Sequence, residues 1–291
     1  RMEHIIATSD LTKSYQGNIV VDKVNLHVKK GEIYGFVGPN GAGKSTTIRT
    51  LLGLIAPTSG SAQLLGMDIL CQKEAILSHV GYMPSEASFY RNMRVKEIIK
   101  LSADLRHRDC RAEAKKLCER LELDVTKKIR ELSLGNRKKV SIVCALQHMP
   151  DLCILDEPTS GLDPLMQREF YAILEERNQK GATIFVSSHI LSEIQRYCRH
   201  AAVIREGRLL ALDSTERLGH TDTKRVWLGG VHVPPDLPHM KDIQTDGDSV
   251  SFLYDGNLKE LLNTLSALPL TDVSITEPDL EEIFMHYYEE E

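Results

Sequence analysis

The segment GPNGAGKS, residues 38–45, constrains the fold of this chain more than any other part of its sequence. It fits the pattern G-x-x-x-x-G-K-[ST], follows an apolar stretch expected to form a strand at residues 33–37, and precedes a helical pattern. In such a loop, small residues let backbone N–H groups surround phosphate oxygens, and the following helix directs its positive end at the same anion. The motif therefore predicts a phosphate-binding strand–loop–helix unit rather than a chance glycine-rich turn.

Two side chains of this loop have tasks of their own. We expect the Lys44 ammonium to reach the β- and γ-phosphates of a nucleoside triphosphate and to serve catalysis there. We expect the Ser45 hydroxyl to complete a Mg²⁺ shell made mainly of oxygens and water. The predicted phosphate-binding residues are Gly38, Pro39, Asn40, Gly41, Ala42, Gly43, Lys44, Ser45 and Thr46.

A second motif, LCILDEP at residues 152–158, ends an apolar strand in two acids. Asp156 is predicted to hold Mg²⁺, usually through water. Glu157 points the other way and is predicted to accept a proton from the attacking water. Strands that end in merely solvated acids are common, so this motif is weak alone. Together with the loop at 38–45 it strongly indicates a P-loop enzyme in which water attacks a γ-phosphate.

The two motifs lie far apart in the chain. Lys44 and Asp156 are separated by 112 positions, whereas a compact βαβ unit needs only about thirty. Between them, apolar residues recur at helical spacing, as at Val95, Ile98, Leu101 and Leu105, a stripe expected to pack in the core. The sequence therefore predicts a helical block, about residues 86–145, inserted between the nucleotide motifs, which argues against a small kinase or GTPase.

Further residues, in order and spacing, resemble the ATP-binding cassette of ABC transporters, from about Ile5 to Leu212. Residues 133–136, SLGN, stand where the family has its LSGGQ signature, and residues 160–163, SGLD, resemble its D-loop. The resemblance implies an α/β P-loop NTPase fold with a RecA-like core, an antiparallel β subdomain and a helical subdomain. It also implies ATP and Mg²⁺ as cofactors.

The same resemblance assigns the remaining candidate site residues. Tyr15 looks like the aromatic residue that stacks on adenine, and His189 looks like the switch histidine of the catalytic group. Ser133 and Gly135 resemble the signature positions that meet the γ-phosphate. Asp163 of the D-loop and Ser85, in the segment GYMPSE, complete the set of nucleotide-contacting residues that the family implies.

The sequence departs from the family pattern in two places. Leu134 and Asn136 replace residues of the signature, and we expect them to weaken a dimer contact. Ser85 stands where the family has glutamine, and its shorter hydroxyl cannot reach as far towards Mg²⁺. The second departure bears on how the nucleotide state is relayed to a partner.

A separate C-terminal unit is predicted from charge. Residues 221–291 hold 15 acidic and 4 basic side chains, whereas residues 1–220 hold 26 acidic and 32 basic side chains. We expect a cassette at 1–219 and a small α+β domain at 220–291, with strands in RVWLGGVHV and SVSFLYD and helices in LKELLNTLSAL and DLEEIFMHYY. A cassette followed by such an acidic tail resembles the ATPases of ABC-2 type exporters.

Composition sets limits on location and partners. No apolar run approaches the roughly 18 residues that span a bilayer, and the first residues lack the apolar core of a signal peptide. The six cysteines form no CxxC pair, so reduced thiols in the cytoplasm are expected. The small, scattered positive excess of residues 1–220 gives no case for direct nucleic-acid binding.

These observations lead to one main hypothesis and two alternatives. The resemblance implies a homodimer with ATP sandwiched between the loop of one chain and the signature of the other. The chain would power export through a separate integral membrane permease, lying peripherally on the inner face of the cell membrane. The first alternative is a soluble, non-transport ABC ATPase that acts on ribosomes or DNA. The second is a nucleotide-binding module without useful turnover, against which Glu157 argues.

Overall fold

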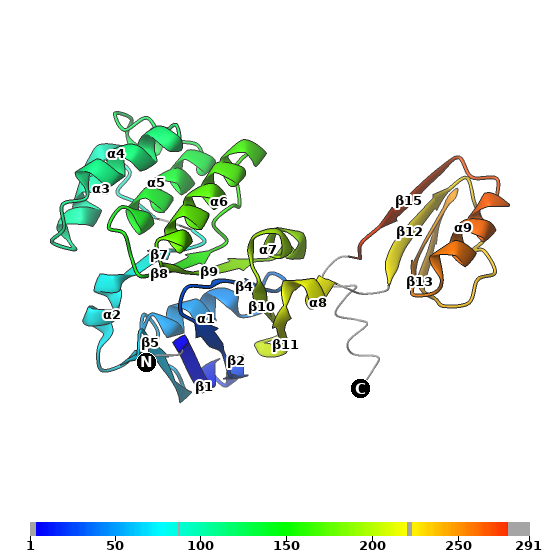
Figure 1. Ribbon diagram of the computed structural model, residues 1–291, viewed down its shortest axis with the longest axis horizontal. Coiled ribbons are helices and arrows are strands. Elements are labelled where there is room, and N and C mark those ends of the chain that lie inside the picture. Colours follow the sequence, from blue (N-terminus) through cyan, green and yellow to red (C-terminus); the bar gives the residue numbers. More distant parts are fainter. Residues whose placement is uncertain (1–3, 87, 220–222, 279–291) are drawn as a thin grey trace. The chain divides into compact units, whose positions relative to one another are not determined.

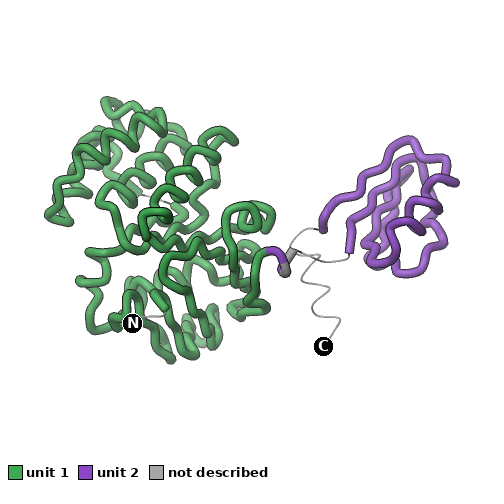
Figure 2. The backbone as a smooth tube through the Cα atoms, viewed as in Figure 1, with its two compact units in different colours: residues 1–215 green, residues 216–291 purple. Residues whose placement is uncertain are grey.

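The computed structural model describes residues 4–86, 88–219 and 223–278. The chain divides into two compact units, residues 1–215 and residues 216–291 (Figure 2). A short helix, α8 (Thr215–Gly219), begins at this division. The boundary expected from the sequence lay after residue 219.

A six-stranded sheet forms the centre of the first unit (Figure 1). Five of its strands run parallel, and the edge strand β11 is antiparallel to β10. In order across the sheet, the strands are β11 (Arg208–Ser214), β10 (His200–Arg205), β4 (Ile33–Val37), β9 (Thr183–Ser188), β8 (Leu152–Asp156) and β7 (Val80–Met83). Strands β8 and β9 are buried along their whole length, as expected of central parallel strands covered on both faces.

An antiparallel sheet forms a second layer of this unit. Its strands are β2 (Asn18–Val24), β1 (His4–Tyr15), β5 (Ser59–Leu64), β6 (Met67–Asp68) and β3 (His27–Lys29), the last paired with β1. Helix α1 (Lys44–Leu51) contacts this sheet and strand β8 of the six-stranded sheet. Ile48 of α1, Leu11 of β1 and Phe36 of β4 belong to one buried apolar cluster. This shared core holds the start of α1 against the ends of the central strands.

The helical block lies beyond the β7 edge of the six-stranded sheet (Figure 1). It contains α3 (Val95–Asp104), α4 (Arg111–Arg120), a 3-10 turn (Ile129–Glu131) and α5 (Leu134–Leu146). The remaining helices of the unit are α2 (Lys73–His79), α6 (Pro164–Gln179) and α7 (Leu191–Tyr197). Helix α5 contacts β7, α3 and α4 and so joins the block to the sheet.

Two expectations about this block need correction. The helical structure begins not near residue 86 but at Val95, where the Glu97 carboxylate accepts a hydrogen bond from the backbone N–H of Arg94, the N-cap residue, at 2.7 Å. Val95 and Ile98 are buried as expected, but Leu105 is 71% exposed. Leu105 is the C-cap of α3 and its N–H still donates to the Leu101 carbonyl oxygen, so the expected stripe keeps its helical spacing but is not covered at this end of the helix.

In the residues that the structure describes from 223 to 278, the second unit is a four-stranded antiparallel sheet with one helix packed on it. The strand order is β13 (Met240–Asp246), β14 (Ser249–Tyr254), β12 (Lys224–Gly229) and β15 (Asp272–Thr276), and the helix is α9 (Leu258–Ser266). Leu261 and Leu265 of α9 pack with Val226 and Phe252 of the sheet in a core of their own. The helix expected in DLEEIFMHYY lies outside the described residues.

Two further findings bear on the expectations from composition. Among the described residues, none of the helices combines the length and the apolar character that crossing a membrane requires. All six cysteines are free thiols, and Cys110, Cys118, Cys153 and Cys198 are buried.

Candidate active site

The glycine-rich loop between β4 and α1 has the backbone shape that its sequence predicts. Gly43 takes a φ of +102°, and a Cβ there would lie 2.6 Å from the carbonyl oxygen of Val20. Only glycine fits such a position without strain. The Lys44 ammonium folds back over the loop and donates to the carbonyl oxygens of Gly38 at 2.6 Å and Pro39 at 3.1 Å. The loop and its lysine therefore form one preorganised cradle at the start of α1.

The two acids are held by one hydroxyl from the neighbouring strand. Asp156, at the end of β8, pairs in register with Ser187 of β9. The Ser187 hydroxyl donates to Asp156 Oδ1 at 2.6 Å and accepts a hydrogen bond from the Glu157 backbone N–H at 3.0 Å. Glu157 has a φ of +48°, a left-handed conformation that is uncommon for a residue with a side chain. This backbone turn separates the directions of the two carboxylates.

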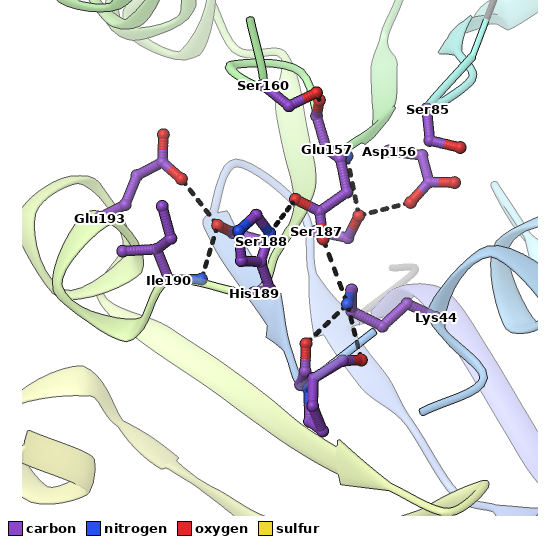
Figure 3. A network of polar contacts seen from close by, with 12 residues as sticks. Lys44, Ser85, Asp156, Glu157, Ser160, Ser187, Ser188, His189, Ile190 and Glu193 are labelled. Carbon is purple, nitrogen blue, oxygen red and sulfur yellow. Dashed lines mark hydrogen bonds and ion pairs between the residues drawn. The ribbon is translucent and has the colours of Figure 1, made fainter. Parts of the chain in front are cut away.

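The Glu157 carboxylate lies between a lysine and a histidine (Figure 3). Its Oε1 is 3.1 Å from the Lys44 ammonium, and its Oε2 is 2.8 Å from His189 Nδ1. The Glu157 side chain is only 14% exposed, whereas that of His189 is 43% exposed. The three predicted catalytic residues therefore form one contact chain, although they come from the ends of three different elements.

The loop that carries His189 is anchored on both sides of the histidine. The Ser188 hydroxyl donates to Glu193 Oε2 of α7 at 2.7 Å and accepts from the Ile190 N–H at 3.0 Å (Figure 3). These bonds hold the backbone from the end of β9 into the start of α7. His189 is thereby presented to Glu157 from a fixed turn.

A pocket of about 510 Å³ opens over these residues. This volume lies in the range that small-molecule sites usually have. The pocket is lined by Val20, Asn40, Gly41, Gly43, Lys44, Ser45, Thr46, Ser85, Glu86, Glu157, Ser160 and His189. A larger hollow of about 1180 Å³ lies in the helical block around α3 and α4, but no residue of the phosphate loop lines it. We therefore take the smaller one, called the phosphate pocket below, as the nucleotide site.

Seven predicted nucleotide-contacting residues do not line this pocket within the described chain: Gly38, Pro39 and Ala42 of the phosphate loop, and Tyr15, Ser133, Gly135 and Asp163 outside it. Tyr15 ends β1 and is 43% exposed, with the Lys13 ammonium 5.0 Å from its ring centre. Ser133 caps the N-terminus of α5, and Asp163 caps that of α6. A Cβ on Gly135 would lie 2.6 Å from the Gly161 carbonyl oxygen, so the signature and D-loop segments contact each other.

Sequence reasoning missed several residues that shape the site. Ser187 joins the two acids, Val20 lines the phosphate pocket, and Lys138 contacts the loop of Ser85. A signal for Ser187 was present, because the carboxyl ends of parallel strands meet at one sheet edge and Ser187 ends the strand beside Asp156. Val20 lies in β2 and Lys138 in α5, and each reaches the site only through the folding of elements that are far apart in the chain.

The residues at this edge suit a magnesium ion. Asp156 Oδ2 is buried and has no hydrogen-bond partner among the residues that the structure describes. A buried carboxylate oxygen without a partner costs free energy of folding unless a cation or a water molecule binds to it. The Ser45 hydroxyl on the neighbouring phosphate loop supplies a second oxygen. Hard oxygen donors, few in number and leaving room for phosphate and water, are what Mg²⁺ prefers.

Comparisons with known proteins agree with this geometry. A family model described as "ABC transporter" matches residues 21–160. Bacitracin transport ATP-binding protein BcrA of Bacillus licheniformis is 43% identical over 215 residues, which is 72% of this chain and 69% of that protein. Probable multidrug ABC transporter ATP-binding protein YbhF of Escherichia coli is 38% identical over 221 residues, 74% of this chain but only 38% of that protein.

A solved structure supports the same relation at the level of the fold. The chain is similar to the ATP-binding subunit of an ABC transporter with a TM-score of 0.69 and 31% sequence identity. The match covers 74% of this chain and 91% of that one. The cassette fold expected from the motifs, with its parallel core, antiparallel sheet and helical block, is thereby confirmed.

Proposed function

This chain belongs to the ABC transporter family of ATP-binding proteins, and from this premise we propose that it hydrolyses ATP to power export through a separate membrane permease. The observation that carries the proposal is Glu157, a carboxylate held between Lys44 and His189 at the mouth of a phosphate-binding loop. The relatives' names, which refer to bacitracin transport and to a probable multidrug transporter, support transport as the coupled process.

The contacts of Lys44 indicate how ATP prepares the site. The Lys44 ammonium pairs with Glu157 and donates to two loop carbonyls. The γ-phosphate is a stronger anion and competes for the same ammonium. Lys44 then turns to the phosphates, and Glu157 remains held by His189. The freed carboxylate accepts a proton from the attacking water as the bond between the γ-phosphorus and the leaving oxygen breaks.

We propose that Ser45 and Asp156 hold Mg²⁺ beside the phosphates. The ion, when bound, would neutralise part of the phosphate charge and orient the γ-phosphate. Ser187 fixes the direction of Asp156 through the hydrogen bond to Oδ1, which leaves Oδ2 free for the ion or its water. The phosphate loop, residues 38–46, would bind the β- and γ-phosphates, and Tyr15 would stack on adenine.

A second copy of the chain would complete the pocket. Ser133 and Gly135 do not line the phosphate pocket of their own chain, and they lie at the N-terminus of α5, whose backbone N–H groups attract anions. Next to them, the Leu134 side chain is 63% exposed. We propose that two chains meet head to tail, so that the signature of each contacts the γ-phosphate held by the other. Because each ATP contacts both chains, its hydrolysis would weaken the dimer.

The permease and the location are parts of the same proposal. An ATPase of this family does work only when its nucleotide state is passed to a partner that forms the membrane path. The helical block and the loop that follows β7 are the surfaces that we assign to this partner. Peripheral attachment to the inner face of the cell membrane would follow from that contact. The alternative of a soluble ATPase acting on ribosomes or DNA is not favoured by the relatives, which are named for transport.

Replacing Glu157 by glutamine tests the proposed chemistry. The wild-type chain should hydrolyse ATP in the presence of Mg²⁺, and Glu157→Gln should lose about 10² to 10⁴ of that rate because the amide cannot accept the proton. Glu157→Gln should still bind ATP and, mixed with ATP and Mg²⁺, should form a dimer by light scattering. Lys44→Ala should lose both affinity and turnover. Equal rates for wild type and Glu157→Gln would refute the assignment of the base.

A further inference from the structure

Lys138 is a buried lysine beside the active site that the mechanism above does not use. It lies in α5, three residues after Gly135 and therefore one helical turn from the signature, and it is only 5% exposed. Lysine side chains are almost never fully buried unless their ammonium group is paired. The burial of Lys138 therefore indicates that its ammonium group has a partner.

The partner is a backbone oxygen in the wall of the phosphate pocket. The Lys138 ammonium donates to the carbonyl oxygen of Ser85 at 2.6 Å. Ser85 and Glu86, in the loop that follows β7, both line the phosphate pocket, and Figure 3 shows Ser85 on the same side of the site as Asp156. The bond uses the main chain and not the side chain. This bond therefore does not depend on the side chain at position 85, where this chain has serine and the family has glutamine.

Charge links Lys138 to the catalytic acids as well. Burial lowers the pKa of the Lys138 ammonium, and the carboxylates of Asp156, Glu157 and Glu86 act in the opposite direction. These three acids are therefore near enough to interact with the ammonium electrostatically. Such interactions are stronger in a poorly hydrated site than in water, so a change of charge in the pocket alters the force on α5.

We propose that Lys138 is a positioning residue for ATP hydrolysis, which ties α5 to the pocket wall at Ser85 and passes the state of the phosphate site to the signature. Phosphate charge entering beside Ser85 and Glu86 attracts the ammonium. Helix α5 carries that ammonium and, one turn earlier, Gly135 and Ser133. Nucleotide binding in one pocket thereby sets the position of the signature that acts in the other pocket. This inference rests on the proposed ATPase function.

Substitutions at Lys138 test the link in the full-length chain. Lys138→Met removes charge and hydrogen bond, Lys138→Gln keeps an N–H donor without charge, and Lys138→Arg keeps both. The Met and Gln variants should lose about 10-fold to 100-fold in kcat, with KM for ATP changed less than about twofold, as expected when a supporting contact is removed. Lys138→Arg should recover most of the loss. The control is Lys115→Met, which removes an exposed lysine of α4. Its kcat and its KM for ATP should equal those of the wild type.

A second measurement separates positioning from simple destabilisation. Hydrogen exchange at residues 133–146 should slow in the wild type when ATP and Mg²⁺ are added, and this slowing should be largely lost in Lys138→Gln at saturating ATP. Thermal unfolding of each variant identifies any that fails to fold. A Gln variant with wild-type kcat, or an Arg variant no better than Met, would overturn the proposal. A wild type without ATPase activity would instead refute the proposed function itself.

Discussion

At the scale of single residues, the site depends on a few side chains that hold other side chains. Ser187 is the clearest case, since one hydroxyl donates to Asp156 and accepts from the Glu157 N–H. Neither bond touches a ligand. The position of Ser187 therefore determines how well the two acids are placed for the nucleotide and the ion that we propose they contact.

Replacing Ser187 by alanine should disturb both acids together. We expect kcat to fall by about 10-fold to 100-fold, the usual cost of removing a supporting partner of an ion-binding carboxylate. The Mg²⁺ concentration that gives half-maximal activity should rise, because Asp156 loses its orienting bond. Ser78→Ala, which removes an exposed hydroxyl of α2, is the control. An unchanged magnesium dependence would contradict the role given to Ser187.

His148 makes stability depend on pH. The side chain is 3% exposed, and burial, with help from Arg106, lowers its pKa to about 4. The unfolded chain takes up this proton below about pH 6.5, whereas the folded chain resists it until about pH 4. Stability is therefore full above pH 6.5 and falls as the pH drops, by about 2 kcal/mol at pH 5 from this residue alone.

Urea unfolding at pH 7.5 and pH 5.0 measures this loss. His148→Gln keeps a donor that can bond to the Val80 carbonyl oxygen, the partner of His148 Nε2 at 3.3 Å, but it cannot take up a proton. Its free energy of unfolding should therefore fall about 2 kcal/mol less than that of the wild type over the same pH range. Parallel losses in the two proteins would show that other groups are responsible.

At the scale of elements, the start of α5 decides how the signature is presented. Ser133 caps this helix by accepting from the Asn136 N–H at 3.3 Å, and Gly135 packs against the Gly161 carbonyl oxygen. The helix end and the D-loop segment before α6 therefore form one surface. A disturbance of either segment should reach the other.

Gly135→Ala tests this packing. The added methyl group would lie 2.6 Å from the Gly161 oxygen, closer than such atoms approach, so the start of α5 must move. Overpacking of this kind costs about 1–3 kcal/mol. In a Glu157→Gln background, ATP should then drive dimerisation at about tenfold higher protein concentration or worse, which light scattering would record. Dimerisation as tight as in Glu157→Gln alone would contradict the proposed role of this surface.

Elements also show how far the sequence could predict this protein. The phosphate loop and the strand ending at Asp156 were predictable because their residues are contiguous, and the family motifs gave the fold class. Helix α2 and strands β7, β13 and β15 were not predicted, since α2, β13 and β15 mix polar and apolar residues and β7, though apolar, has only four residues, too few for a periodic signal. The contacts of Ser187 and Lys138 join residues far apart in the chain, so no local pattern could show them.

At the scale of the whole molecule, each unit has its own apolar core. The first core includes Phe36, Ile48 and Phe185, and the second includes Val226, Phe252 and Leu261. The residues that line the phosphate pocket all belong to the first unit. ATP hydrolysis should therefore not require the second unit, even if the regulation of hydrolysis does.

A chain that ends at residue 219 should fold and hydrolyse ATP. Its pocket contacts are intact, so we expect the rate per chain to lie within about threefold of the full-length rate, a difference of well under 1 kcal/mol in the barrier. Hydrolysis and thermal unfolding of the two proteins provide the measurement. A folded but inactive shortened chain would show that the second unit takes part in catalysis itself.

The pairing of Asp156 with Ser187 across β8 and β9 makes the activity of this site depend on the register of the two strands. His189 follows the same strand β9 by one position after its end, so both acids and the imidazole are aligned by a single inter-strand register. A one-residue slip would turn Ser187 to the opposite face and misplace all three groups at once. A shift of this register should thus abolish turnover outright, whereas loss of the Ser187 hydroxyl alone only slows it.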